Sequence, residues 1–127
     1  MSFKGKNYNK ILEKLHPNLK SILIEVSKNE DIYLLCSFRG EIEQNTAFLE
    51  KKSKAQFGQS PHNFNPSLAF DIAPFPLNWN DIEAFKKLSI IVLNIAKKMN
   101  IEISWGGDWH SFKDYPHYEL KNWKFLK

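Results

Sequence analysis

The sequence predicts an α+β fold in which helices flank a small, mainly antiparallel β-sheet. Apolar residues recur at helical spacing in the first 30 residues and again over residues 81–99, whereas the other apolar runs have the length of single strands. With 127 residues, 43% of them hydrophobic, the chain is expected to form one domain, residues 1–127. Its helical part covers residues 1–30, and residues 32–120 carry the motifs described below.

The helical part predicts two helices, over residues 8–15 and 17–28. Pro17 fits the first turn of the second helix, and the Asn-Glu-Asp sequence at residues 29–31 ends it. Residues 32–38 form a short apolar run that predicts a strand buried on both faces.

Residues 41–54 have apolar residues at helical spacing, and residues 55–66 are rich in Gly, Pro, Ser and Asn, which indicates a long ordered loop. Residues 68–72 predict a strand, and residues 81–99 predict the longest amphipathic helix.

Two more short strands are expected at residues 101–105 and 117–120. The segment between them, residues 106–116, predicts a loop because it is polar and aromatic.

The chain is moderately basic, with 18 Lys plus Arg against 14 Asp plus Glu and a net charge of +4. Its lysines are scattered, and Arg39 is the single arginine, so the clustered Arg and Lys surface of a nucleic-acid-binding protein is not predicted. A diffuse positive charge suits attraction to a polyanionic matrix such as a bacterial cell wall.

The first residues are polar and lead to no apolar segment typical of a secretory signal, and no apolar run approaches the length of about 20 residues that spans a bilayer. We therefore expect no membrane insertion and a location in the cytoplasm. Cys36 is the single cysteine, so the sequence predicts neither an internal disulfide nor a Cys-rich zinc site.

Two histidines and one aspartate are candidates for a metal site. His62 and His117 each lie near the start of a predicted strand, and Asp71 lies within an apolar strand, where a carboxylate is costly unless it is paired or metal-bound. An open catalytic zinc site needs three such ligands and leaves one position free. The alternative is that these side chains are hydrogen-bonded structural groups.

Four short motifs in order resemble the D-alanyl-D-alanine carboxypeptidase family of zinc peptidases. They are Ser60-Pro61-His62, Ala69-Phe70-Asp71, Trp105-Gly106-Gly107-Asp108-Trp109 and Asp114-Tyr115-Pro116-His117. Within that family the chain most resembles phage endolysins that act as L-alanyl-D-glutamate endopeptidases, and the resemblance covers about residues 32–120. It implies a fold like that of the hedgehog and D-Ala-D-Ala peptidase domains.

The resemblance implies that His62, Asp71 and His117 bind Zn²⁺. It implies that Asp114 is the general acid/base, which takes a proton from water and returns it to the leaving amine. Arg39 would stabilise the carbonyl oxygen of the scissile bond or bind a substrate carboxylate, for which a planar guanidinium is better suited than lysine.

Further residues are expected around this centre. Ser60, Gln44 and Trp105 are candidates for substrate binding. Ser60 is equally suited to fixing the His62 loop, glutamine at the position of Gln44 more often packs or caps locally, and aromatic residues in a small domain are more often part of the core. Trp109 flanks the same Gly-Gly turn as Trp105 and is a second candidate for a cleft wall.

Asp108 and Glu119 are candidates to orient a ligand histidine. His110 also follows an acidic residue and is the rival of His117, whose Pro-His-Tyr-Glu context and following strand favour it. His16, at a predicted helix junction, is expected to be structural.

One departure from the common family pattern lies between the first two ligands. Asp71 comes nine positions after His62, two more than is usual, and Asn65-Pro66-Ser67 fills the region. The two extra residues must bulge as a loop if Asp71 is to reach the metal.

The leading hypothesis is a zinc peptidase that cleaves an amide in the stem peptide of bacterial peptidoglycan, between L-Ala and D-Glu. As a phage endolysin it would be a monomer held in the host cytoplasm until a membrane-disrupting protein such as a holin releases it to the cell wall. The alternatives are a D-Ala-D-Ala carboxypeptidase or dipeptidase, a non-catalytic zinc-stabilised binding domain of the same fold, and a basic nucleic-acid-binding module.

Overall fold

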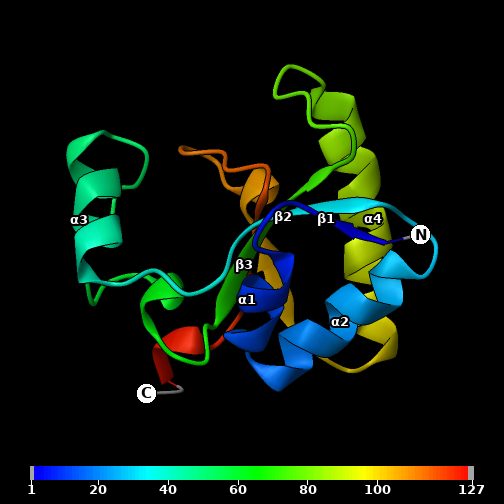
Figure 1. Ribbon diagram of the computed structural model, residues 1–127, viewed down its shortest axis with the longest axis horizontal. Helices are drawn as coiled ribbons and strands as arrows, with labels where there is room; N and C mark the ends of the chain where they lie inside the picture. The colour runs from blue at the N-terminus through cyan, green and yellow to red at the C-terminus, as the bar shows by residue number, and fades with distance from the viewer. Residues whose placement is uncertain (1, 126–127) are drawn as a thin grey trace.

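The computed structural model describes residues 2–125 and shows a five-stranded sheet with helices on one face (Figure 1). The strands lie in the order β1-β2-β3-β5-β4, and only the β1–β2 pair is parallel. The strands are β1 (Phe3–Lys4), β2 (Ile32–Cys36), β3 (Ala69–Pro74), β4 (Ile103–Trp105) and β5 (His117–Leu120). The α-helices are α1 (Tyr8–Glu13), α2 (Pro17–Ser27), α3 (Glu41–Leu49) and α4 (Ile82–Lys98). Three short 3₁₀ helices cover Pro61–Asn63, Gly106–Asp108 and Trp123–Phe125.

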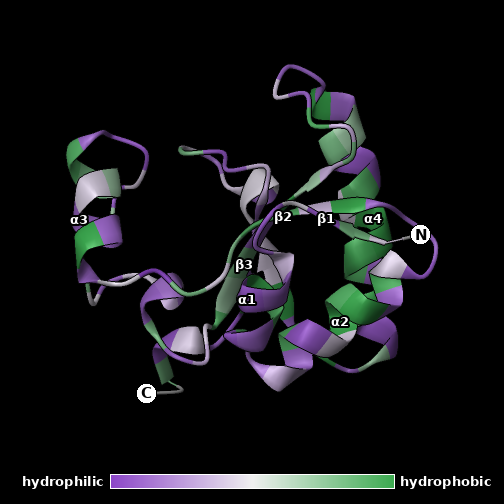
Figure 2. Ribbon diagram, in the orientation of Figure 1, coloured by the Kyte–Doolittle hydropathy of each residue, from purple (hydrophilic) through white to green (hydrophobic). Residues whose placement is uncertain are grey.

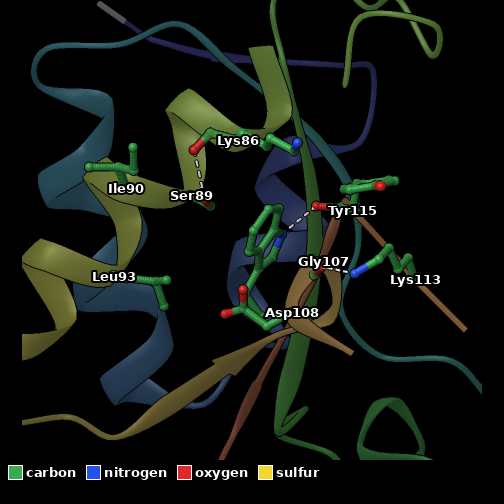
Figure 3. Close-up of a pocket in the computed structure, with 9 residues that line it drawn as sticks. Lys86, Ser89, Ile90, Leu93, Gly107, Asp108, Lys113 and Tyr115 are labelled. Atoms are coloured by element: carbon green, nitrogen blue, oxygen red, sulfur yellow. Dashed lines mark hydrogen bonds between the residues drawn. The ribbon is translucent and has the colours of Figure 1, made fainter. Parts of the chain in front are cut away.

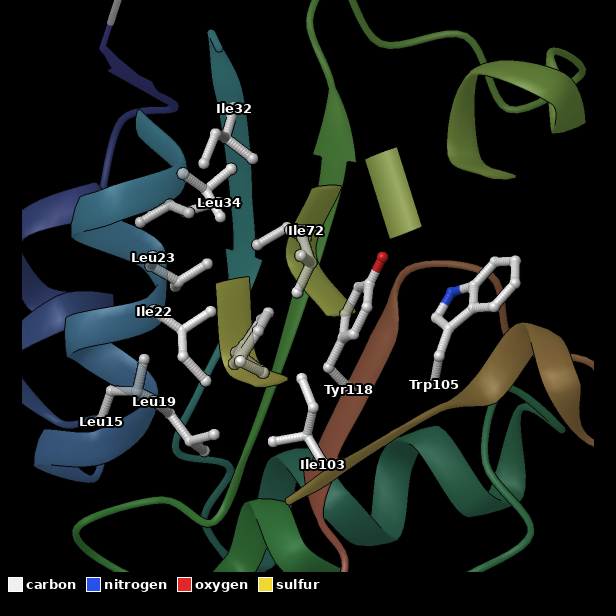
Figure 4. Packing of buried hydrophobic residues seen from close by; sticks show 14 of the residues in the cluster. Leu15, Leu19, Ile22, Leu23, Ile32, Leu34, Ile72, Ile103, Trp105 and Tyr118 are labelled. Atoms are coloured by element: carbon white, nitrogen blue, oxygen red, sulfur yellow. The ribbon is translucent and has the colours of Figure 1, made fainter. Parts of the chain in front are cut away.

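The hydrophobic core lies between the sheet and the pair α2 and α4 (Figures 2 and 4). From β3 and β5 it receives Phe70, Ile72 and Tyr118, of which Phe70 and Tyr118 stack with ring centroids 5.1 Å apart. Because side chains alternate along a strand, the intervening residues of β3 and β5 point to the opposite face of the sheet. The site described below lies on that opposite face.

Helix α4 begins and ends where its sequence indicates. The side chain of Asp81 accepts a hydrogen bond from the Ala84 backbone amide (3.2 Å), which caps the first turn. Lys97 and Lys98 occupy the last turn, where positive charge suits the helix dipole. Helix α2 has a different cap, since His16 Nδ1 accepts from the Asn18 amide (3.1 Å), and this gives His16 the structural role expected for it.

Three features differ from the expectations. Strand β1 was not predicted, because a two-residue strand leaves no periodic pattern. Helix α3 ends at Leu49 instead of continuing to residue 54, because Lys51 adopts a left-handed backbone conformation (φ 61°) that terminates the helix. Strand β2 is not buried on both faces, because Leu35 on its second face lines the cleft that is described in the next subsection.

Helix α3 stands apart from the layer formed by α2 and α4, on the other side of the molecule (Figure 1). Its apolar residues Ile42 and Leu49 are 77% and 78% exposed, and Gln44 is its one buried residue. The loop over residues 106–116 projects on the same side of the sheet as α3. Within the part of the chain described, no helix combines the length and apolarity needed to cross a bilayer.

Candidate metal centre and active site

Asp71, His62 and His117 meet at one point on the open face of the sheet. The register of β3 and β5 places Asp71 directly opposite His117, and the 3₁₀ helix over Pro61–Asn63 brings in His62. Asp71 Oδ1 lies 3.2 Å from His62 Nε2 and 3.0 Å from His117 Nδ1, and the two ring nitrogens are 3.2 Å apart. Both histidines are buried.

In each histidine, the ring nitrogen that faces away from Asp71 has a hydrogen-bond acceptor. The other ring nitrogen, which faces Asp71, is therefore the one available to a metal. His62 Nδ1–H donates to the Ser37 carbonyl (2.6 Å), and His117 Nε2–H donates to Glu119 Oε1 (2.7 Å). Glu119 is held in turn by Trp123, whose Nε1–H donates to its other carboxylate oxygen (2.9 Å). Glu119 therefore has the orienting contact expected of it.

The spacing of His62 Nε2, His117 Nδ1 and Asp71 Oδ1 fits a zinc ion. Tetrahedral zinc with bonds of about 2.0–2.1 Å needs ligand atoms about 3.3 Å apart, close to the 3.0–3.2 Å observed between these atoms. Two imidazoles and one carboxylate form a donor set that zinc uses in open catalytic sites. The residues present therefore fit the metal that the resemblance implies.

Cys36 is a second possible metal ligand near this centre. Its sulfur, with His62 and Asp71, belongs to a group of ligand atoms that lie within 4.8 Å of one another. The sulfur is 3.9 Å from His62 Nδ1, however, and that nitrogen is engaged by Ser37 on the side of the ring away from Asp71. His117 is thus better placed than Cys36 as the third ligand.

The charges of the centre are strongly coupled. Burial lowers the pKa of His62, but the charge and hydrogen bond of Asp71 outweigh burial and raise it to about 10. For His117 burial also acts downward, and its hydrogen bonds to Asp71 and Glu119, together with the charge of Asp71, raise its pKa to about 9. Burial acts to raise the pKa of Asp71, yet the two histidines hold it well below its usual range. These shifts favour positive charge at the point where the three side chains meet, as a divalent cation would supply it.

Arg39 lies beside the centre and is held from two sides. Its guanidinium donates to Gln44 Oε1 (3.1 Å) and lies 3.6 Å from Asp71 Oδ2. Only 19% of the Arg39 side chain is exposed, and the side chain lines the same cleft as the three candidate ligands.

Gln44 is fully buried beneath Arg39 and does not line the cleft. Its Oε1 accepts from Arg39 and Asn63, and its Nε2 donates to Ser53 Oγ and the Ala55 carbonyl. Every hydrogen-bonding group of the amide is engaged within the protein, which corrects the expectation that Gln44 contacts substrate. It positions Arg39 instead.

Asp114 lies half-buried in the same cleft, on the loop that leads into β5. Burial raises its pKa to about 6, with a further upward contribution from the charge of Asp71, and the two histidines and Arg39 oppose this rise. A carboxyl with a pKa close to neutrality is suited to exchange protons at physiological pH.

The Gly-Gly sequence explains how the loop carrying Asp114 is placed. A Cβ atom at Gly106 would collide with the backbone and Cβ of Asp114, and one at Gly107 would collide with the indole of Trp105. The Asp114 amide donates to the Gly106 carbonyl (3.1 Å), and the Trp105 indole donates to the Tyr115 carbonyl (2.7 Å). The motif therefore packs the loop against the end of β4.

Trp105 itself is not part of the cleft, which corrects the expectation that it binds substrate. It pairs with Tyr118 across β4 and β5 and so faces the core side of the sheet (Figure 4). There it borders a separate cavity of about 440 Å³, together with Asp108 and Tyr115 (Figure 3). Asp108 faces that cavity as well and contacts neither histidine ligand candidate.

Trp109 is the tryptophan of this motif that reaches the cleft, with its ring centroid 5.2 Å from that of His117. His110 is exposed and is not among the residues that line the cleft. The structure therefore brings His117, not His110, to Asp71.

Ser60 is buried and fixes the loop that carries His62. Its Oγ accepts from the His62 amide (3.2 Å), and Asn63 Oδ1 accepts from the Ser60 amide (3.1 Å), forming a capping box. Of the two roles expected for Ser60, these contacts favour the positioning role, although the residue also lines the cleft.

The extra residues between His62 and Asp71 are packed against the helical part. The Ser67 amide donates to the Lys14 carbonyl (2.7 Å), and the His16 amide donates to the Ser67 carbonyl (3.0 Å). Ser67 Oγ donates to the Ser37 carbonyl (2.9 Å), the same carbonyl that accepts from His62. The insertion is thus absorbed as a loop, as expected, and Asp71 remains within reach of His62.

The cleft around this centre has a volume of about 880 Å³ and is lined by aromatic and basic side chains as well as by the residues above. The aromatic residues are Trp79, Trp109, Phe112 and Trp123, and the lysines are Lys52, Lys54 and Lys124. Sequence reasoning missed the lysines, Trp79 and Trp123 as cleft residues, since nothing in their local sequence distinguishes them from other surface positions.

The chain is similar to two proteins of named activity. It is 30% identical over 133 residues to the L-alanyl-D-glutamate peptidase of Escherichia phage T5, which covers 95% of this chain and 91% of the phage protein. It is 29% identical over 107 residues to the peptidoglycan L-alanyl-D-glutamate endopeptidase CwlK of Bacillus subtilis (strain 168). That alignment covers 74% of this chain and 63% of the Bacillus protein, so the chain spans less than two thirds of this relative.

The fold is shared with a solved structure. The crystal structure of the Serratia marcescens L-Ala D-Glu endopeptidase ChiX matches with a TM-score of 0.83 at 19% identity, covering 98% of this chain and 94% of that one. This likeness confirms the predicted fold class.

A family model described as phage L-alanyl-D-glutamate peptidase matches residues 1–125. The match spans nearly the whole chain and confirms both the family suggested by the motifs and the predicted class of enzyme, a peptidase. This chain belongs to the phage L-alanyl-D-glutamate peptidase family.

Proposed function

We propose that this protein is a zinc-dependent endopeptidase that hydrolyses the amide between L-Ala and D-Glu in the stem peptide of bacterial peptidoglycan. The observation that carries the proposal is the convergence of His62, Asp71 and His117 on one point, in a cleft that also contains Asp114 and Arg39. The named bond follows from the activity of the relatives in the same family.

His62 Nε2, His117 Nδ1 and Asp71 Oδ1 would hold the zinc ion. When bound, zinc supplies Lewis acidity that polarises a carbonyl oxygen and makes a water more acidic. Ser37 and Glu119 keep the two imidazoles in the tautomers that binding requires.

Asp114 is the general base and then the general acid. Its carboxylate takes a proton from the attacking water, and the carboxylic acid so formed gives that proton to the nitrogen of the leaving D-Glu residue. A pKa of about 6 lets the same group carry out both steps near neutral pH.

Arg39 stabilises the negative charge that develops on the carbonyl oxygen of the scissile bond. Its guanidinium is already oriented by Gln44 and Asp71, so little reorganisation accompanies the reaction. The remaining donors of the guanidinium are available to the substrate, since the side chain lines the cleft.

The biological role that we propose is that of a phage endolysin. The similarity to the phage T5 peptidase over 95% of this chain supports this role. The protein would act as a monomer that stays in the host cytoplasm until a separate membrane-disrupting protein, such as a holin, gives it access to the cell wall. Its net charge of +4 favours approach to that anionic wall.

The test is digestion of purified cell walls by the zinc-loaded protein, followed by identification of the new chain ends. We expect new amino groups on D-Glu and new carboxyl groups on L-Ala. Release of D-alanine instead would identify a carboxypeptidase, and the absence of any cleavage with zinc bound would overturn the proposal. An Asp114→Asn variant, which keeps all three ligands, is the matched inactive control.

A further inference from the structure

Two walls of the cleft meet at a contact between Lys54 and Phe112. Lys54 follows α3, and Phe112 lies in the loop that projects toward α3 on the same side of the sheet (Figure 1). The Lys54 ammonium lies over the Phe112 ring, 4.9 Å from its centroid, and both residues line the cleft. Lys54 is exposed, and the contact holds its positive charge over the Phe112 ring at the cleft.

The other two cations near this part of the cleft already have carboxylate partners. Arg39 lies 3.6 Å from Asp71, and Lys52 Nζ lies 3.2 Å from Glu50 with 75% of its side chain exposed. Among the described residues, no carboxylate lies within ion-pair distance of Lys54. Within residues 2–125, Lys54 is therefore a cleft lysine without a carboxylate partner.

The loop that contacts Lys54 also carries Asp114, which acts on the leaving part of the substrate in the proposed reaction. Phe112 precedes Asp114 by two residues in the same loop, and Lys54, Phe112 and Asp114 all line the cleft. Asp114 delivers its proton to the nitrogen of the D-Glu residue in the proposed reaction. In peptidoglycan D-Glu is linked onward through its γ-carboxyl, so its α-carboxylate is free and sits one carbon from that nitrogen.

We propose that Lys54, held by Phe112, binds the free α-carboxylate of the D-Glu residue and makes the enzyme select it over the α-carboxamide form. This inference rests on the proposed function. An ammonium forms an ion pair and a hydrogen bond with a carboxylate, whereas a carboxamide accepts a weaker hydrogen bond and carries no opposite charge. Lys54 is thus a specificity-determining residue, and it has no part in the proton transfers.

The experiment compares two synthetic stem peptides that differ only at this group, one with D-glutamate and one with D-isoglutamine. The variants are Lys54→Met and Lys54→Arg, with Lys52→Met as the matched control for loss of one lysine at the same cleft. We expect the wild type to prefer the carboxylate peptide by about five- to tenfold in kcat/KM, mainly through KM, because one partly exposed charged contact is at stake.

Lys54→Met should cleave the two peptides equally, whereas Lys54→Arg and Lys52→Met should keep the preference. Equal cleavage of both peptides by the wild type, or an unchanged preference in Lys54→Met, would overturn the inference while leaving the proposed function intact. Failure of the wild type to cleave either peptide would overturn both.

A binding measurement separates recognition from turnover. In the zinc-loaded Asp114→Asn protein, the Kd of the carboxylate peptide should rise about five- to tenfold when Lys54→Met is added, and the Kd of the carboxamide peptide should stay the same. Equal effects on the two peptides would assign Lys54 a general structural role and contradict the proposal.

Discussion

The two histidines proposed as ligands, His62 and His117, present different ring nitrogens to Asp71, and their hydrogen-bond partners explain why. The Ser37 carbonyl engages Nδ1 of His62, and the Glu119 carboxylate engages Nε2 of His117. Each partner is therefore as necessary to the geometry as the ligand that it orients. A carboxylate partner also makes the imidazole of His117 a stronger donor to a metal.

Replacing Glu119 by Gln should lower zinc affinity by about 10–100-fold, because the charge that orients His117 is lost while the ligand remains. Competition with a chromophoric chelator measures this change. Cys36→Ser is the matched control and should bind zinc as the wild type does. Loss of zinc from Cys36→Ser would instead identify the sulfur as a ligand.

Asp114 should give the enzyme an acid limb in its pH profile. Burial and the charge of Asp71 raise its pKa to about 6, and a bound cation would move it lower, so kcat/KM should rise with pH through a midpoint at or below about pH 6 and level off above that midpoint. Asp114→Asn should lower kcat by about 10²–10⁴-fold and remove this limb from the residual activity. Unaltered zinc content shows that the site is intact, and an acid limb that persists in the variant would assign the titration to another group.

The sequence predicted the residues that meet in the cleft better than those around them. His62, Asp71, Asp114 and His117 lie in short motifs that resemble a known family, and the structure brings them into one cleft. Trp105 was assigned to the cleft because it flanks the Gly-Gly turn. The face of the sheet on which its side chain lies depends on the register of β4 with β5, which the sequence does not specify.

Contacts between distant segments were not accessible to sequence reasoning either. Gln44 was expected at the substrate, but its four hydrogen bonds reach residues up to 19 positions away and bury the amide completely. The contact of Lys54 with Phe112 joins two loops whose approach depends on the whole fold.

At the level of elements, the loop over residues 106–116 connects the packed end of β4 to the residues of the proposed active site. Its start is packed against β4 by the two glycines, and its end enters β5 at His117. Apart from β1, the order of the α-helices and strands was predicted because their sequences show a clear apolar period, a strand-length apolar run or a capping residue, as Asp81 shows for α4. The early end of α3 depends on the backbone conformation of one residue, Lys51, which apolar spacing does not reveal.

Gly106→Ala should lower activity while the protein keeps its zinc. The new Cβ would collide with the backbone of Asp114, so the loop must shift and carry the general base away from the metal. A misplacement of about 1 Å can cost about 100-fold in rate. Zinc stoichiometry and turnover measured on the same sample test this, and full activity in Gly106→Ala would show that the close packing does not position Asp114.

At the scale of the whole molecule, the two faces of the sheet have different functions. Its core face supplies stability through α2 and α4, and its open face gathers ligands from β3, β5 and the His62 loop. A metal that joins these three segments holds together parts of the chain that lie far apart in the sequence. Binding to the folded state alone also raises stability by mass action.

Zinc at 100 times its Kd should therefore stabilise the fold by about 2.7 kcal/mol, which for a domain of this size raises the Tm by about 10 °C. Differential scanning fluorimetry with and without a chelator measures the shift. His117→Ala, which removes one ligand, should lose the zinc-dependent shift. The same shift in this variant would place the metal elsewhere.

The most direct test of the account is a titration of the chelator-treated protein with zinc, in which bound metal and cleavage of the L-Ala–D-Glu bond are measured together. We predict that cleavage is absent without metal and rises in proportion to bound zinc until one ion per chain is present. His117→Ala should recover neither. Cleavage that persists in the metal-free protein, or that stays absent when one zinc ion is bound per chain, would contradict the account.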